Sequence, residues 1–472
     1  MTQAVEVKDL TPEQLVLQKK LVKILDFRLL VWSFFAYFCN GLDRNNMPYA
    51  YTSGMPEDLG LVKDQYNWAV TMFFIGYVIL QIPSNAIITR VRPSIMLPTI
   101  TFLWGAVVSF MSLVKNPQGL YGLRITLGFS EAAFYPGIVY LLGSWYTKEE
   151  LGARTAIFVA GSQLSGAFSG LISGAISQTL HGQNGMSGWK WLFIIEGVIA
   201  MFVALFGFFL LPDMPANTRF LSPELRELAV YRLQRQGRQT NITGFNWVTF
   251  RNLFSSPYIL IYIIVFSIMQ IGMQMLTQFP IILKTMGYDT TWASYMNAPV
   301  WVVAAIVIIA QGYLSDWKGA RVWHVVGGAI ITIVFYIILV AVNGGEVSTT
   351  LLFVCVYFIT PVLGISPIFM TWLNEFYSVD VETRALAIAT VNSIGNLAPN
   401  FANVKIWLVS DAPAFRNGKI ITMSLMILLV ILVIAMHYCQ QAGLWLPKRS
   451  DKIETDSTVS NMDKPHEADE TV

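Results

Sequence analysis

Residues 190–211 read KWLFIIEGVIAMFVALFGFFLL, and this stretch decides the kind of fold. A helix needs roughly 20 mostly apolar residues to cross the hydrocarbon core of a bilayer. The stretch is long enough, and apart from Lys190 at its edge it carries one charged side chain, Glu196. It therefore predicts a helix that spans a membrane.

The same pattern recurs along the chain and predicts twelve spans in two sets of six. The first set is expected near residues 29–50, 66–88, 94–113, 120–145, 154–179 and 190–211. The second set is expected near residues 257–283, 292–314, 322–342, 350–374, 382–409 and 419–441. The fold class predicted is thus an all-α membrane protein.

Polar segments divide the chain into five parts. These are an N-terminal tail (1–28), a first six-helix bundle (29–211), a central loop (212–256), a second six-helix bundle (257–441) and a C-terminal tail (442–472). Ser222-Pro223-Glu224 has the pattern of a helix start, so a short helix is expected over residues 225–236. The C-terminal tail is rich in Ser, Asp and Glu and is expected to be disordered.

The composition excludes several classes of protein. Hydrophobic residues make up 54% of the chain and charged residues 13%, whereas a soluble domain carries roughly 25% charged residues. A net charge of +2 gives no basic field for nucleic acid. The three cysteines and four histidines show no metal-ligand or disulfide spacing, so we expect no metal and no cofactor.

Lysine and arginine are distributed unevenly between the loops. If both termini are cytoplasmic, the cytoplasmic segments hold most of the 31 basic residues. Cytoplasmic loops of membrane proteins carry an excess of Lys and Arg. The sequence therefore predicts a multi-pass protein with both termini in the cytoplasm.

The two predicted halves resemble each other. The loop after the eighth span contains Gly312, Asp316, Gly319 and Arg321, and the loop after the second span, at residues 85–92, is a weaker copy of it. Trp145-Tyr146 with Arg154 in the first half resembles Phe376-Tyr377 with Arg384 in the second. Repeated halves are typical of transporters, in which the binding site lies between the repeats near the midplane. These loop residues are candidates for gate contacts.

The first and fourth predicted spans carry four charged residues, namely Asp43, Arg44, Arg124 and Glu131. A charge at the centre of a bilayer costs at least roughly 2.5–3.5 kcal/mol, so such residues usually face a cavity or a partner. Two interpretations remain open for them: a binding and proton-exchange site, or structural ion pairs between helices. For Glu196, in the sixth span, the structural interpretation is favoured.

Polar side chains in the second half are further candidates for the lining of a cavity. Amides recur at helical spacing on the seventh and eleventh spans, at Gln270, Gln274, Gln278, Asn392, Asn396 and Asn400. They are expected either to face a cavity or to hydrogen-bond between helices. Lys405 would either contact an anion or extend its ammonium to the outer interface.

Small residues and prolines complete the pattern. Gly166, Gly170 and Gly174 form a double GxxxG on the fifth span and predict a neighbouring helix at close range. Pro136 and Pro399 are expected to bend or break their helices.

Several short motifs together resemble the major facilitator superfamily. The Gly312–Arg321 loop is similar to its loop motif, although Thr89 and Arg92 depart from it in the first-half copy. The match is more specific to the anion:cation symporter group and its fungal allantoate permease branch. It rests on residues 42–45 (LDRN), 65–68 (QYNW), 128–132 (GFSEA), 135–137 (YPG), 189–197 (WKWLFIIEG) and 392–396 (NSIGN). Residues 51–59 lean toward the pantothenate and biotin carriers of that branch.

The resemblance implies two pseudo-symmetric six-helix bundles, alternating access and proton-driven uptake of a small organic anion. In its terms Asp43 and Glu131 would couple protons. Arg44 and Arg124 would bind the anion, since a guanidinium grips carboxylates and stays charged. Gln270, Gln274, Asn392, Asn396 and Lys405 would complete the substrate site. A monomer in the plasma membrane is expected.

Three other functions remain as alternatives. The protein could export a metabolite or drug, or it could be a nutrient sensor that binds without transporting. A membrane enzyme receives little support, because the sequence shows no catalytic triad and no metal cluster.

Overall fold

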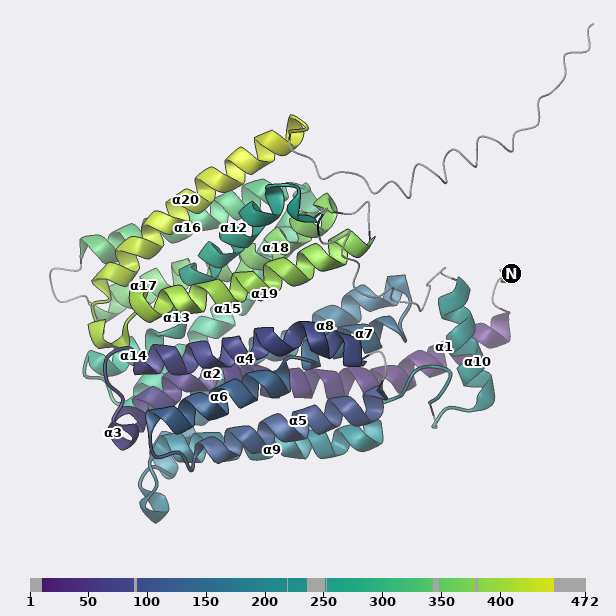
Figure 1. The fold of residues 1–472 in the computed structure, drawn as a ribbon, viewed down its shortest axis with the longest axis horizontal. Helices are drawn as coiled ribbons and strands as arrows, with labels where there is room; N and C mark the ends of the chain where they lie inside the picture. Colours follow the sequence, from purple (N-terminus) through teal and green to yellow (C-terminus); the bar gives the residue numbers. More distant parts are fainter. Residues whose placement is uncertain are drawn as a thin grey trace, which may run out of the picture.

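The structure is a computed structural model that describes residues 11–88, 91–218, 220–235, 251, 253–342, 348–377 and 381–444. Across these ranges all regular structure is helical. Figure 1 shows two groups of roughly parallel helices, one from the first half of the chain and one from the second. The predicted all-α fold with two six-helix bundles is confirmed.

The first bundle follows the predicted spans closely. Its members are α2 (Val31–Thr52), α4 (Gln65–Ile88), α5 (Pro93–Met111), α6 (Pro117–Glu131) with α7 (Phe134–Gly143), α8 (Lys148–Thr179) and α9 (Gly188–Leu210). A short helix, α3 (Met55–Leu59), connects α2 to α4.

In the second bundle, two spans are broken into shorter helices and four are single helices. Its members are α12 (Tyr258–Gly272) with α13 (Gln274–Thr277) and α14 (Phe279–Thr285), α15 (Thr290–Lys318), α16 (Arg321–Ala341), α17 (Thr349–Ile359) with α18 (Pro361–Phe376), α19 (Val381–Ile406) and α20 (Arg416–Gln441).

Nine of these segments are long and apolar enough to cross a membrane by length and composition alone, within the described residues. The other three of similar length are α2, α4 and α19. Two of them owe their lower hydropathy to the residues expected at the site: α2 carries Asp43 and Arg44, and α19 carries a row of asparagines.

One proline interrupts its helix as predicted and the other does not. Pro136 has no N–H to donate to the carbonyl of residue 132. Accordingly, α6 ends at Glu131 and α7 begins at Phe134, which leaves a break directly beside a candidate site residue. Pro399 lies inside α19, which continues through it to Ile406.

Two helices extend one end of the first bundle. The first is α1 (Pro12–Leu25), which continues through a π-helical turn, Asp26–Leu30, directly into α2. The second is α10 (Pro223–Arg235), which packs beside α1 (Figure 1). Ser222 Oγ accepts from the N–H of Leu225 at 3.4 Å, so the predicted start of the central-loop helix is confirmed.

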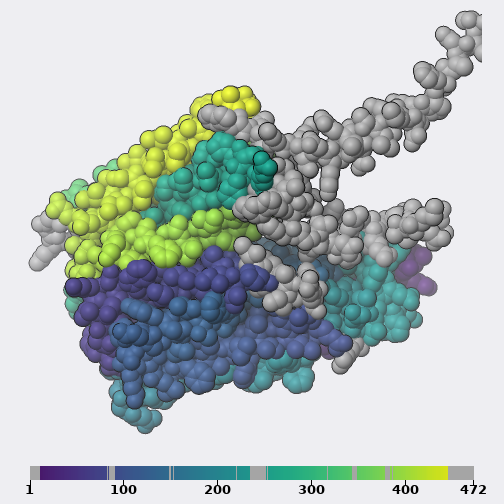
Figure 2. Space-filling model, viewed as in Figure 1, coloured from purple at the N-terminus to yellow at the C-terminus, as the bar shows by residue number. Residues whose placement is uncertain are grey.

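The glycine stripe of α8 brings the two bundles into close contact. A Cβ at Gly170 would lie 2.7 Å from the carbonyl oxygen of Ser294 on α15, and one at Gly174 would lie 2.4 Å from the ring of Tyr295. A space-filling view shows the two bundles stacked directly on one another (Figure 2). The close packing predicted from this stripe is confirmed, and the partner helix belongs to the opposite bundle.

Candidate functional site

The centre of the site is an ion pair between α2 and the end of α6. Arg44 Nε lies 3.2 Å from Glu131 Oε2, and Asn40 donates to the same oxygen at 2.7 Å. The side chain of Glu131 is fully buried, whereas 32% of the Arg44 side chain is exposed. Arg44 therefore connects a sealed carboxylate to an open face of the bundle.

Two further carboxyl groups lie along α2 on either side of this pair. Asp43 is completely buried, and neither of its oxygens has a hydrogen-bond partner among the described residues. Glu196 of α9 is also buried and accepts from Asn46 Nδ2 at 3.0 Å, while its other oxygen is unpaired in the same part of the chain. An isolated ionised carboxylate is costly to bury, so these two groups are suited to carry protons.

Arg124 is held without a carboxylate partner. Its Nε donates to the carbonyl of Ala69 at 3.3 Å, and Nη1 is buried with no partner among the described residues. The ring of Phe73 lies close to both arginines, 5.1 Å from Cζ of Arg124 and 5.4 Å from Cζ of Arg44. Aromatic faces attract cations, so Phe73 contributes to stabilising both positive groups.

Close packing of α4 on α6 explains this position of Arg124. A Cβ at Gly128 would lie 2.1 Å from the carbonyl of Phe73, and one at Gly76 would lie 2.3 Å from the carbonyl of Ile125. The two backbones therefore approach to a distance that only glycine permits. This approach carries the Arg124 guanidinium against the backbone of α4.

The second bundle contributes amides rather than charges. Gln270 Nε2 donates to Asn396 Oδ1, and Asn396 Nδ2 donates to Asn392 Oδ1 at 3.0 Å. All three side chains are half-buried. They form one chain of hydrogen bonds between α12 and α19, as the helix-bonding interpretation of these amides expects, and their role in lining a cavity stays a prediction.

The predicted amide stripe on the seventh span is not a single straight face. The span breaks after Gly272 and again at Gln278. Gln274 consequently bonds locally to Thr277, and Gln278 is buried with an unpaired Oε1. The expected spacing assumed a continuous helix, and in the broken span the three amides have different partners.

Lys405 pairs with an acid of the opposite bundle at the outer ends of the helices. Its Nζ lies 2.8 Å from Asp64 Oδ2, just before α4 begins, and 74% of its side chain is exposed. The hydrogen bond from Lys405 lowers the pKa of Asp64 below its ordinary value. The ammonium thus pairs with Asp64 at an exposed end of the helices, and its contact with an anion or with the outer interface stays a prediction.

Other contacts also join the bundles at this end. Asn67 Nδ2 donates to the carbonyls of Asn403 and Trp407 at 3.1 and 2.8 Å, and Thr71 donates to the carbonyl of Asn400 at 3.1 Å. With the α8–α15 contact, they join the two bundles at the end opposite α1.

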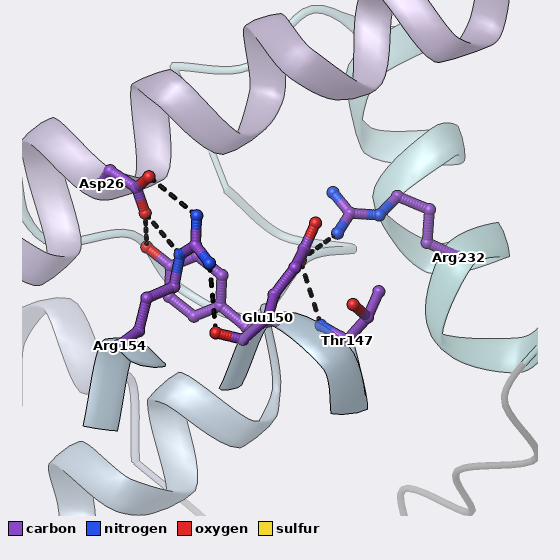
Figure 3. Close-up of polar contacts among 6 residues, drawn as sticks. Asp26, Thr147, Glu150, Arg154 and Arg232 are labelled. Carbon is purple, nitrogen blue, oxygen red and sulfur yellow. Dashed lines mark hydrogen bonds and ion pairs between the residues drawn. The ribbon is translucent and has the colours of Figure 1, made fainter. Parts of the chain in front are cut away.

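Arg154, one of the predicted gate residues, belongs to a network at the opposite end of the first bundle, shown in Figure 3. Arg154 binds Asp26 through two bonds, Nε–Oδ1 at 2.7 Å and Nη2–Oδ2 at 2.9 Å, and its guanidinium lies 4.7 Å from the ring of Tyr146. Glu150 pairs with Arg232, so the network also ties α8 to α10. It joins four elements of one bundle rather than the two bundles.

The corresponding residues of the second bundle form a smaller contact. Arg321 Nε lies 2.7 Å from Glu375 Oε1, which joins α16 to α18. Gly319 has φ +61° and ends α15, a conformation that favours glycine. Gly312 and Arg384 are half-buried on α15 and α19, and the side chain of Asp316 lies outside the described residues.

Comparison with known proteins identifies the family. The family model "Major Facilitator Superfamily" matches residues 33–403. The chain belongs to the major facilitator superfamily.

Individual superfamily members show how far the similarity extends. "MFS transporter PfmaC" of Pestalotiopsis fici is 32% identical, covering 85% of this chain and 76% of its own. A "Putative tartrate transporter" of Agrobacterium vitis is 28% identical over 89% and 91% of the two chains. The "Pantothenate transporter FEN2" of Saccharomyces cerevisiae is 26% identical over 88% and 82%.

The same fold is found in a solved superfamily structure, a bacterial homologue of the human lysosomal transporter Spinster. It aligns with a TM-score of 0.67 at 16% identity and covers 94% of this chain and all of that one. This chain is thus a multi-pass membrane transporter of small molecules.

Sequence reasoning found the four charged site residues but gave Glu196 a structural role. The structure places Glu196 in contact with Asn46, one turn from Asp43 on α2. Phe73 and Asn40 were not singled out at all. An available signal was the row of polar residues on α2, since Asn40, Asp43 and Asn46 share a helix face at intervals of three.

Proposed function

We propose that this superfamily member imports a small organic anion together with protons by alternating access. Within the superfamily we assign it to the anion:cation symporter group and its fungal allantoate permease branch. The proposed setting is the plasma membrane, with both termini cytoplasmic and the protein monomeric. The observation that carries the proposal is the balance of charge around α2.

The charged groups around α2 do not cancel. Arg44 and Arg124 supply two positive charges, because arginine stays protonated in proteins. Asp43, Glu131 and Glu196 supply three carboxyl groups. If all three were ionised, a net negative charge would remain inside the bilayer, at a cost of at least roughly 2.5–3.5 kcal/mol. At least one carboxyl group therefore carries a proton at rest.

An anionic substrate changes this balance in a way that couples it to protons. A carboxylate that binds Arg44 from the exposed side competes with Glu131 for the guanidinium, and it adds one more negative charge to the cluster. A further proton on Glu131 removes both the competition and the excess charge, and one on Asp43 removes the excess charge. Binding of the anion and of the proton thus favour each other, and loss of the proton on the other side favours release.

The contacts between the bundles support alternating access. The bonds of Asn67 and Thr71 and the packing of Gly170 lie toward the outer end. The Arg154–Asp26 network joins elements of the first bundle alone. The arrangement fits a state that is closed at the outer end.

Two relatives support the class of substrate. Two relatives are named as transporters of tartrate and of pantothenate, and both compounds are small carboxylates. A carboxylate fits an exposed guanidinium beside a second, under-bonded one.

Flux into proteoliposomes tests the proposal. Proteoliposomes that contain the purified protein should accumulate pantothenate or tartrate when the outside is acidic. A pH gradient of the opposite sign should reverse the direction of the flux. Arg124→Ala should abolish this flux at normal abundance, whereas Lys115→Ala, an exposed outer residue, should not. Wild-type flux in Arg124→Ala would refute the binding role, and flux indifferent to the pH gradient would refute proton coupling.

A further inference from the structure

A groove lies on α1 and the π-helical turn, next to the N-terminal end of the first span. It has a volume of about 590 Å³. Four basic residues line it: Lys19, Lys20, Lys23 and Arg28. The other described residues that line it are apolar, and none of the described lining residues is acidic. Figure 1 shows α1 emerging from the end of the bundle in line with α2.

The lysines of the groove have no internal partner. Lys19, Lys20 and Lys23 are exposed, and none of them forms an ion pair with a described residue. Arg28 donates to the carbonyl of Phe209 at 3.3 Å, and its Cζ lies 4.1 Å from the Phe220 ring. The groove therefore presents at least three uncompensated positive charges.

The apolar part of the groove continues the lipid-facing side of the first span. Phe27, Val31 and Phe35 are spaced four residues apart and are 66%, 41% and 50% exposed. They share one helix face. Val16, farther along the groove, is 69% exposed. A surface that is apolar in the span thus turns basic just beyond its end.

The spacing along the helix matches the depth of the headgroup layer. Helices rise about 1.5 Å per residue, so Lys23 lies about 6 Å beyond Phe27 and Lys19 about 12 Å beyond it. The headgroup layer is about 5–8 Å thick on each side of a bilayer. Lys23 therefore falls among the headgroups, and Lys19 and Lys20 lie where a charged headgroup extends into water.

We propose that this groove binds the headgroup of an anionic phospholipid from the adjacent leaflet. The basic side chains match the phosphate and the headgroup charge, and Phe27 contacts the top of the acyl chains. A soluble anion would need only the lysines, whereas a lipid also uses the exposed aromatic face. The bound lipid would hold α1 and Asp26 in place, next to the Arg154 contact.

The test compares lipid preference in nanodiscs of phosphatidylcholine with and without phosphatidylserine. Native mass spectrometry counts retained lipids, and thermal unfolding measures stabilisation by bound ligand. A basic residue near an anionic surface contributes about 1 kcal/mol, so three lysines should favour phosphatidylserine on the order of 100-fold. The variant Lys19→Gln/Lys20→Gln/Lys23→Gln should lose this preference and the associated rise in unfolding temperature.

A matched control separates the groove from general surface charge. Lys63→Gln/Lys115→Gln/Lys284→Gln removes three exposed lysines at the other end of the molecule and should keep the preference. The proposal is overturned if the groove variant behaves like the wild type, or if both triple variants lose the preference equally. Equal stabilisation by soluble glycerophosphoserine in detergent would also overturn it, because the site would then bind a free anion.

Discussion

Gly170 offers the sharpest test of how the outer side closes. Gly170→Ala would place a Cβ 2.7 Å from the carbonyl oxygen of Ser294 and 3.1 Å from the hydroxyl of Tyr49. Ordinary carbon contacts lie at about 3.5–4.0 Å. The carbonyl belongs to the backbone of α15 and has no rotamer by which to move away, so α8 and α15 must separate slightly.

The expected magnitude follows from this overlap. Forcing a methyl group into a packed contact costs about 1–3 kcal/mol. The cost applies to the state in which the outer ends touch and is relieved when they part. Such a difference shifts the ratio of the two states by about 5- to 150-fold toward the outward-open one.

Accessibility of a buried outer residue measures this shift. Asn403 is 5% exposed and its side-chain amide has no partner among the described residues. Asn403→Cys therefore makes a mild reporter, in a background in which the native cysteines are replaced by alanine. An impermeant maleimide added outside should label it faster in Gly170→Ala by the factor given above, up to the limit set by full opening.

Gly152→Ala is the matched control on the same helix. No atom lies within 4 Å of a Cβ at Gly152, so labelling should stay at the rate of the unsubstituted reporter. If Gly170→Ala folds normally and labels no faster than Gly152→Ala, then the α8–α15 contact does not govern opening, and the reasoning fails.

Three further changes test the charged contacts. Glu196→Gln should leave the number of protons coupled to each anion unchanged, measured from reversal potentials in proteoliposomes, because it removes the proton held at rest and not the one taken up with the anion; a lower stoichiometry would place the coupled proton on Glu196. Lys405→Gln should leave the apparent affinity for the anion unchanged, since its pair with Asp64 is largely exposed and contributes at most about 1 kcal/mol; a large rise in KM would return this lysine to the binding site. The hydrogen bond from Lys405 depresses the pKa of Asp64. The contribution of the pair to the free energy of unfolding should therefore be constant above the ordinary carboxyl pKa of about 3.9 and should vanish only as the pH falls through the lower pKa of the folded state. Unfolding curves at several pH values would show this. Asp26→Asn should lower the thermal unfolding midpoint by loosening Arg154, and an unchanged midpoint would show that this bidentate pair contributes nothing to stability.

The location of the charged site could be predicted because ionised groups are conspicuous in apolar spans. Arg44 and Glu131 stand out in the sequence for that reason alone. Their pairing does not, since Glu131 has another arginine, Arg124, seven residues away on its own helix. In the structure, Glu131 pairs with Arg44 of α2, and α6 ends at Glu131.

The sequence by itself determined the number, length and order of the membrane helices, because a bilayer allows a buried backbone few alternatives to a helix of sufficient length. The tertiary structure decided which side chains meet: Glu196 with Asn46, Lys405 with Asp64, and the α8 glycines with α15. Such meetings depend on how each helix is rotated and where it breaks. The periodicity of one helix gives no information about which helix faces it, so only the packed bundle could show these pairs.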